Sequence, residues 1–165
     1  MTKVPRWMML LMLTAVAALP AGAQGSSAQP HKTVLFVCEH GNVKSLLAKV
    51  LFERYAGEIG LDVGAVSRGT RPDSVVPAWM QSSLAIERVI LGAWRPQVLA
   101  PADLLSASYV VSFDVPTSAT AGAQAPRVQW DGLPSVSANY ASGRDAIRAR
   151  VRLLADSLKR ASVAR

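Results

Sequence analysis

Short apolar runs alternate with helical patterns along most of the chain. Runs rich in β-branched and aromatic residues predict buried strands at 33–37, 61–67, 108–113 and 127–130. The intervening and following segments predict helices at 44–56, 76–91 and 102–107 and a last helix from residue 142 onward. This alternation predicts a single α/β domain of three layers, in which a four-stranded parallel sheet is flanked by helices.

The last helix has the clearest pattern. Its apolar residues recur at helical spacing and form one stripe, at Ile147, Val151, Leu154 and Leu158. Ser142, followed three residues later by Asp145, is similar to a capping box with Asp in place of the usual Glu or Gln. The pattern therefore predicts that the helix begins at Ser142.

The first 23 residues have the three parts of a secretory signal. A short basic stretch precedes an uncharged apolar run, and small residues follow at Ala21 and Ala23. The apolar run is shorter than the roughly 20 residues that a membrane span needs, although an uncleaved anchor is the alternative. We predict a cleavable signal at 1–23, a polar leader at 24–31 and the folded domain at 32–162. The protein would then be periplasmic or secreted, without membrane contact after cleavage.

Charge and cysteine content exclude several classes of function. The chain carries a net charge of +7 at pH 7, and many of its basic residues lie in the last helix, where a solvated face is the simplest interpretation. Aromatic interleaving and nucleic-acid motifs are absent from the sequence, so we predict no nucleic-acid partner. Cys38 is the only cysteine, which rules out an internal disulfide. With only His31 and His40 as histidines, the sequence shows no metal-ligand cluster, and we predict neither metal nor cofactor.

The single cysteine stands where a buried strand runs into a loop and a helix. In such a loop several backbone N–H groups and the helix N-terminus face one spot, which favours an anion and a thiolate. Gly41 permits the turn, and the Ser45 hydroxyl can donate to the thiolate. The predicted oxyanion cradle consists of Glu39, His40, Gly41, Asn42, Val43 and Lys44.

The stretch VLFVCEHGNVKS, at 34–45, resembles the signature of the low-molecular-weight protein tyrosine phosphatases and of the related arsenate reductases. In that family a cysteine, five residues, an arginine and a serine or threonine follow the first strand. The segments AVSRGT and YVVSFD resemble the family's next strands, so the similarity runs from about 33 to 158. The resemblance implies the four-stranded parallel sheet, with Cys38 as the nucleophile, Lys44 in the arginine place and Ser45 as the hydroxyl.

The loop also departs from the family pattern. Lys44 keeps the positive charge of the arginine but lacks its bidentate fork. Glu39 adds a negative charge beside the anion site, where it could pair with Lys44. Gly41 and Asn42 fall one place later than in the usual version. His40 could donate a proton or tune the thiolate, but a solvent-facing loop histidine is the favoured interpretation.

The resemblance further implies an aspartate acid in a late loop before the last helix. Asp131 follows the fourth strand and is the first choice to protonate the leaving oxygen. Asp114, at the end of the third strand, is the alternative, and either residue could instead cap a turn.

Three functions fit these residues, each with a phosphate ester or another oxyanion as its partner. The first is a hydrolase of phosphate monoesters that passes through a phosphocysteine. The second is an arsenate reductase; since the thioredoxin-coupled mechanism needs two further cysteines, only a version that uses an external thiol remains. The third is a non-catalytic oxyanion-binding domain, for which Lys44 and Glu39 are the best support.

Overall fold

Four parallel strands form one sheet in the order β2-β1-β3-β4. The strands are β1 (Thr33–Cys38), β2 (Gly64–Gly69), β3 (Tyr109–Ser112) and β4 (Arg127–Gln129). This computed structural model describes residues 32–164, so the predicted signal and leader, 1–31, lie outside the described residues. The four-stranded parallel sheet expected from the sequence is confirmed.

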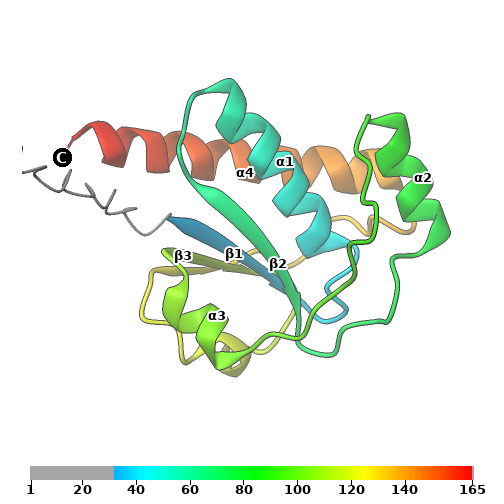
Figure 1. Ribbon diagram of the computed structural model, residues 1–165, viewed down its shortest axis with the longest axis horizontal. Helices are drawn as coiled ribbons and strands as arrows, with labels where there is room; N and C mark the ends of the chain where they lie inside the picture. The colour runs from blue at the N-terminus through cyan, green and yellow to red at the C-terminus, as the bar shows by residue number, and fades with distance from the viewer. Residues whose placement is uncertain (1–31, 165) are drawn as a thin grey trace, which may run out of the picture.

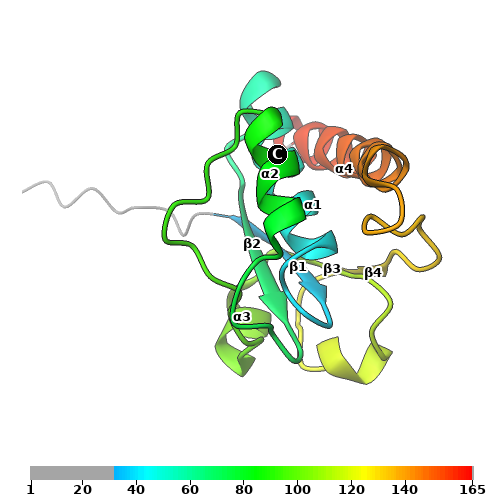
Figure 2. The same ribbon diagram turned by 90° about the vertical axis from the view of Figure 1, so that its right-hand side faces the viewer.

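Helices cover both faces of the sheet (Figures 1 and 2). They are α1 (Lys44–Glu58), α2 (Ala78–Ile86), α3 (Pro101–Ser106) and α4 (Tyr140–Val163), with a short 3-10 helix η1 at Thr117–Thr120. Helices α1 and α4 lie side by side on one face and α3 lies on the other (Figure 1), which confirms the three layers. None of these helices, within residues 32–164, is long and apolar enough to span a membrane.

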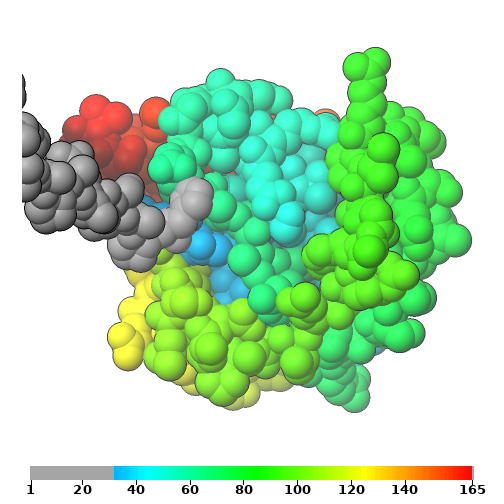
Figure 3. Space-filling view, viewed as in Figure 1, coloured from blue at the N-terminus to red at the C-terminus, as the bar shows by residue number. Residues whose placement is uncertain are grey.

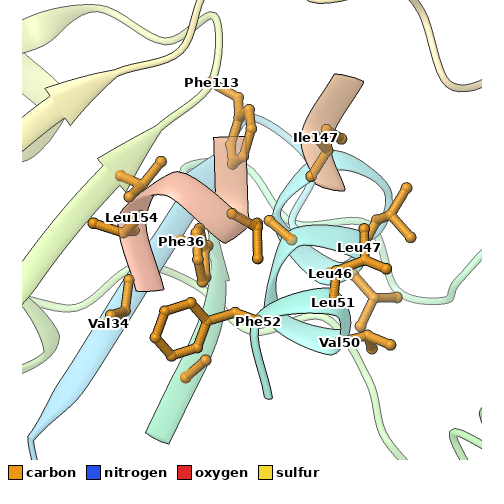
Figure 4. Packing of buried hydrophobic residues seen from close by; sticks show 14 of the residues in the cluster. Val34, Phe36, Leu46, Leu47, Val50, Leu51, Phe52, Phe113, Ile147 and Leu154 are labelled. Carbon is orange, nitrogen blue, oxygen red and sulfur yellow. The ribbon is translucent and has the colours of Figure 1, made fainter. Parts of the chain in front are cut away.

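Strand β1 is apolar throughout because both of its faces are buried. Val34 and Phe36 point into the larger core, where Phe36 meets Phe52 of α1 with ring centroids 5.9 Å apart (Figure 4). Leu35 and Val37 alternate with them and belong to the smaller core on the α3 side. Little of this strand reaches the surface in the space-filling view (Figure 3). The continuous apolar run in the sequence therefore has a direct structural cause.

The start of α4 corrects a prediction made from the sequence. The helix begins at Tyr140 and its N-cap is Asn139, whose side-chain oxygen accepts a hydrogen bond from the backbone N–H of Ser142 at 3.0 Å. Ser142 is thus the third residue of the helix and does not cap it. The predicted start at Ser142 is wrong, because asparagine caps a helix as well as serine does.

Several other boundaries also differ from the predictions, and two of them have a direct backbone cause. Strand β2 starts at Gly64 and not at Leu61, because the backbone N–H of Leu61 still bonds the carbonyl of Ala56 in α1, at 2.8 Å. Helix α2 ends at Ile86 and not at 91, since Arg88 takes a left-handed conformation with φ 62°. The first change lengthens the loop between α1 and β2, and the second lengthens the segment between α2 and α3.

Candidate functional site

The loop between β1 and α1 packs directly against the end of β2. Gly41, at its tip, has φ 68°, and a Cβ built there would lie 2.8 Å from the backbone nitrogen of Gly69. Three backbone carbonyls of this loop accept hydrogen bonds from the segment that follows β2. The pairs are Thr70 to Cys38 at 3.0 Å, Arg71 to Glu39 at 2.8 Å and Asp73 to His40 at 3.2 Å. The loop is therefore held by backbone contacts along its length.

The Cys38 thiol lies under this loop at the end of β1. Its sulfur accepts the backbone N–H of Gly41 at 3.2 Å and lies 3.0 Å from the Ser45 hydroxyl oxygen. The Ser67 hydroxyl lies 2.9 Å from the Ser45 oxygen and 3.2 Å from the Gly41 carbonyl, so its proton can go to either acceptor. Cys38, Ser45 and Ser67 are all buried, and their side chains form a hydrogen-bonded chain beneath the loop.

Helix α1 starts immediately after the loop, at Lys44. Its first turn holds no acidic residue that would neutralise the partial positive charge of the helix N-terminus. The thiol and the loop N–H groups thus lie where an anion is stabilised.

The charged residues of the loop are paired across it. The Lys44 ammonium contacts the Asp114 carboxylate, and the Arg71 guanidinium contacts the Glu39 carboxylate. The hydrogen bond and charge of Arg71 lower the pKa of Glu39 below its ordinary range. The idea that Glu39 pairs with Lys44 is wrong, because each residue has a different partner.

Asn42 and His40 both bond Asp73, a residue that sequence reasoning missed. The buried Asn42 amide donates to Asp73 Oδ2 at 2.6 Å and to the carbonyl of Val75 at 3.3 Å. His40 Nδ1 lies 3.2 Å from Asp73 Oδ1, and half of the imidazole is exposed to solvent. Asn42 thus links the loop to the segment that follows β2. Neither side chain faces the sulfur in any contact that the structure describes.

The two candidate aspartates hold each other. The Asp131 carboxylate accepts the backbone N–H of Asp114 at 2.8 Å, and the Asp114 carboxylate accepts the backbone N–H of Gly132 at 3.1 Å. Asp114 has φ 47°, a conformation that aspartate tolerates better than most residues. The pair links the end of β3 to the segment that follows β4.

A cavity of about 270 Å³ lies over the thiol. Its walls are the loop from Cys38 to Lys44, the end of β3 at Phe113 and Asp114, and a segment from Ser135 to Ser137. Asp114 lines this cavity, whereas Asp131 does not. The structure therefore gathers Cys38, Lys44 and Asp114 around one space and leaves Asp131 behind Asp114.

Ser67, Arg71 and Asp73 complete the site and were not expected from the sequence as site residues. Strands β1 and β2 are parallel neighbours, so their carboxyl ends meet at the same edge of the sheet. The polar residues at and after the end of β2 were the signal that could have found them.

A buried thiol that accepts a loop N–H beside a helix N-terminus is an arrangement that favours an anion. The comparison with protein families agrees: residues 33–129 match the low molecular weight phosphotyrosine protein phosphatase family. The chain belongs to this family, as the resemblance of the cysteine loop implied. The match ends at Gln129, so Asp131 and α4 lie outside the matched segment.

Solved structures with the same fold include both phosphatases and arsenate reductases. A thioredoxin-dependent arsenate reductase from Corynebacterium glutamicum is 24% identical, with a TM-score of 0.65, over 83% of this chain and 66% of that one. A low molecular weight protein tyrosine phosphatase from Bacillus subtilis is 20% identical, with a TM-score of 0.64, over 78% and 97%. An arginine phosphatase from Geobacillus stearothermophilus is 18% identical, with a TM-score of 0.66, over 81% and 96%. Among curated proteins no match was found.

Proposed function

We propose that the protein is a cysteine-dependent hydrolase of phosphate monoesters. The observation that carries this proposal is the environment of Cys38, whose sulfur lies below a 270 Å³ cavity and contacts the Gly41 N–H and the Ser45 hydroxyl. The family, whose members are phosphatases and arsenate reductases, supports cysteine-based chemistry of this kind.

The reaction has two steps. The Cys38 thiolate attacks phosphorus, the bond to the leaving oxygen breaks, and an aspartic acid protonates that oxygen. Water then attacks the phosphocysteine, the same carboxylate accepts a proton from it, and the thiolate leaves. The backbone N–H groups of the loop and the Lys44 ammonium hold the phosphoryl oxygens, and the Ser45 hydroxyl donates to the departing thiolate.

Reduction of arsenate is a second candidate, which the arsenate reductases among the structural neighbours support. Arsenate has the shape and charge of phosphate and would fit the same loop. With Cys38 as the only cysteine, the reducing equivalents would have to come from an external low-molecular-weight thiol. A non-catalytic oxyanion-binding role is the third candidate. The Lys44 ammonium is already paired with the Asp114 carboxylate, so it is less available to stabilise a transition state.

Steady-state assays of the purified, reduced protein on 4-nitrophenyl phosphate test the first candidate, with Cys38→Ser beside the wild type. We expect turnover by the wild type, none by the variant, and inhibition by inorganic phosphate. Arsenate with reduced glutathione, followed by arsenite formation, tests the second. Phosphate that slows alkylation of Cys38, without turnover in either assay, would favour the binding role and contradict the hydrolase.

We also propose that the predicted signal, 1–23, directs export of the protein and is then cleaved. The basic, apolar and small-residue pattern of this segment supports the proposal. Mass spectrometry of the protein from its host should find a mature N-terminus at or near Gln24. A dominant cytosolic species that begins at Met1 would contradict it.

A further inference from the structure

Two carboxylates line the cavity above Cys38, those of Glu39 and Asp114. Glu39 is paired with Arg71, and this pairing lowers its pKa, so it stays ionised. Asp114 is paired instead with Lys44, the residue that stands in the arginine place of the oxyanion loop. An incoming phosphate ester would compete directly with Asp114 for this ammonium.

The backbone around Asp114 is fixed by its neighbours. Its N–H donates to the Asp131 carboxylate at 2.8 Å, and its own Oδ1 accepts the Gly132 N–H at 3.1 Å. Its left-handed φ of 47° is maintained by these contacts. The carboxylate therefore stays at the cavity wall whether or not Lys44 holds it.

Asp131 is differently placed. It does not line the cavity, and one of its carboxylate oxygens accepts the Asp114 N–H. The part of the following segment that does reach the cavity presents Ser135 and Ser137, which carry hydroxyls and no carboxylate. A proton donor for a leaving group in this cavity is thus better supplied by Asp114.

We propose that Asp114 is the catalytic acid and that Lys44 controls it, while Asp131 is a positioning residue. The proposal rests on the proposed hydrolase function and names the proton donor for it. Binding of a phosphate dianion draws the Lys44 ammonium onto the phosphoryl oxygens. The Asp114 carboxylate is then released from Lys44 at the cavity wall, where it can take up a proton and pass it to the leaving oxygen.

The proton comes from the Cys38 thiol. It passes to Asp114, directly or through water, and leaves the thiolate that attacks phosphorus. The sulfur–phosphorus bond forms as the bond to the leaving oxygen breaks, and the Asp114 proton goes to that oxygen. In the second step water gives a proton to the Asp114 carboxylate, its oxygen bonds phosphorus, and the sulfur departs as a thiolate.

The test uses Asp114→Asn, since asparagine also tolerates the left-handed conformation and has nearly the same shape. Esters with leaving groups of different basicity are compared: phenyl, 4-nitrophenyl and 2,4-dinitrophenyl phosphate. An acid matters most for the most basic leaving group. We expect kcat/KM of Asp114→Asn to fall about 10²- to 10⁴-fold on phenyl phosphate and far less on the dinitrophenyl ester. Retained activity on the dinitrophenyl ester also shows that the variant is folded.

Two further variants complete the experiment. Asp131→Ala removes the acceptor of the Asp114 N–H and should loosen the Asp114 backbone without removing the proton donor. Its kcat/KM should fall by about the same factor on all three esters, and by less than that of Asp114→Asn on phenyl phosphate. Asp145→Asn, an exposed aspartate on α4, is the matched control and should leave all three values unchanged. A leaving-group dependence that appears in Asp131→Ala and not in Asp114→Asn overturns the proposal and leaves the hydrolase function standing. An equal loss on every ester in Asp114→Asn also overturns it. Absence of wild-type turnover refutes the hydrolase function and the proposal together.

Discussion

Beneath the loop, Cys38, Ser45 and Ser67 are buried and joined by hydrogen bonds, whereas the ion pairs of Lys44 and Glu39 lie at the solvent side. We call the three buried residues the floor and the two ion pairs the rim. Breaking a buried hydrogen bond costs about 1–3 kcal/mol when a partner is left unsatisfied, while exposed ion pairs contribute about 0–1 kcal/mol. The floor therefore determines the shape of the site, and the rim determines its charge and can change at little cost in stability.

The largest effect is expected where the loop that covers the floor meets β2. Gly41→Ala adds left-handed strain of about 1–2 kcal/mol and a clash with the Gly69 backbone of about 1–3 kcal/mol. We expect the loop to move, with a loss of about 10²-fold or more in kcat/KM and a lower urea midpoint.

The control for this substitution is Gly92→Ala. Gly92 has a similar φ of 56°, but a Cβ added there would meet nothing within 4 Å, so only the strain is shared. Its kcat/KM should equal that of the wild type. If both variants lost the same free energy of unfolding, the contact between the loop and β2 would not contribute to stability.

Removal of Lys44, the rim cation beside the thiol cavity, is expected to have the next largest effect. Lys44→Ala takes one preorganised donor and its charge from the phosphoryl group, and we expect kcat/KM to fall about 10²-fold. Lys49→Ala is a matched control, because Lys49 lies on the same helix, is also paired with a carboxylate and has the same 23% side-chain exposure. Unchanged turnover in Lys44→Ala would mean that the rim has no part in the reaction.

Lys44→Arg tests the rim in the opposite direction. A guanidinium can bind two phosphoryl oxygens at once through its planar fork, which an ammonium cannot do. We expect kcat/KM on 4-nitrophenyl phosphate to rise about tenfold, equivalent to about 1.4 kcal/mol of transition-state stabilisation. A decrease would indicate that the cavity is shaped around the shorter side chain.

The smallest effect is expected for Glu39→Gln. Arg71 lowers the pKa of Glu39 below its ordinary value of 4.5, so the pair stabilises the fold above about pH 4.5 and this contribution is lost as the pH falls through the lowered pKa. Thermal unfolding at several pH values should show a slightly lower Tm for the variant at pH 7. The difference should disappear in acid; a difference that grew there would mean that ionised Glu39 does not stabilise the fold.

The sheet and most of the cysteine loop could be predicted because both follow from local pattern. The residues from Cys38 to Ser45 are consecutive, and β1 directs all of them to the same edge. Ser67 and Asp73 could not be assigned, because their roles depend on which strand lies beside β1. The choice between Asp114 and Asp131 also needed the structure, since both follow strands and only the cavity distinguishes them.

The close packing of Gly143 against Val136 has a mechanical consequence. A Cβ on Gly143 would lie 2.8 Å from Val136, so the wall segment at Ser135–Ser137 rests on the first turns of α4. Helix α4 in turn packs along α1 (Figure 1), and α1 begins at Lys44, which also lines the cavity. Both walls are thus attached to one pair of helices, and the width of the cavity follows the spacing between them. A change of side-chain volume in that helix interface, remote from the thiol, would be transmitted to the size of ester that the cavity admits.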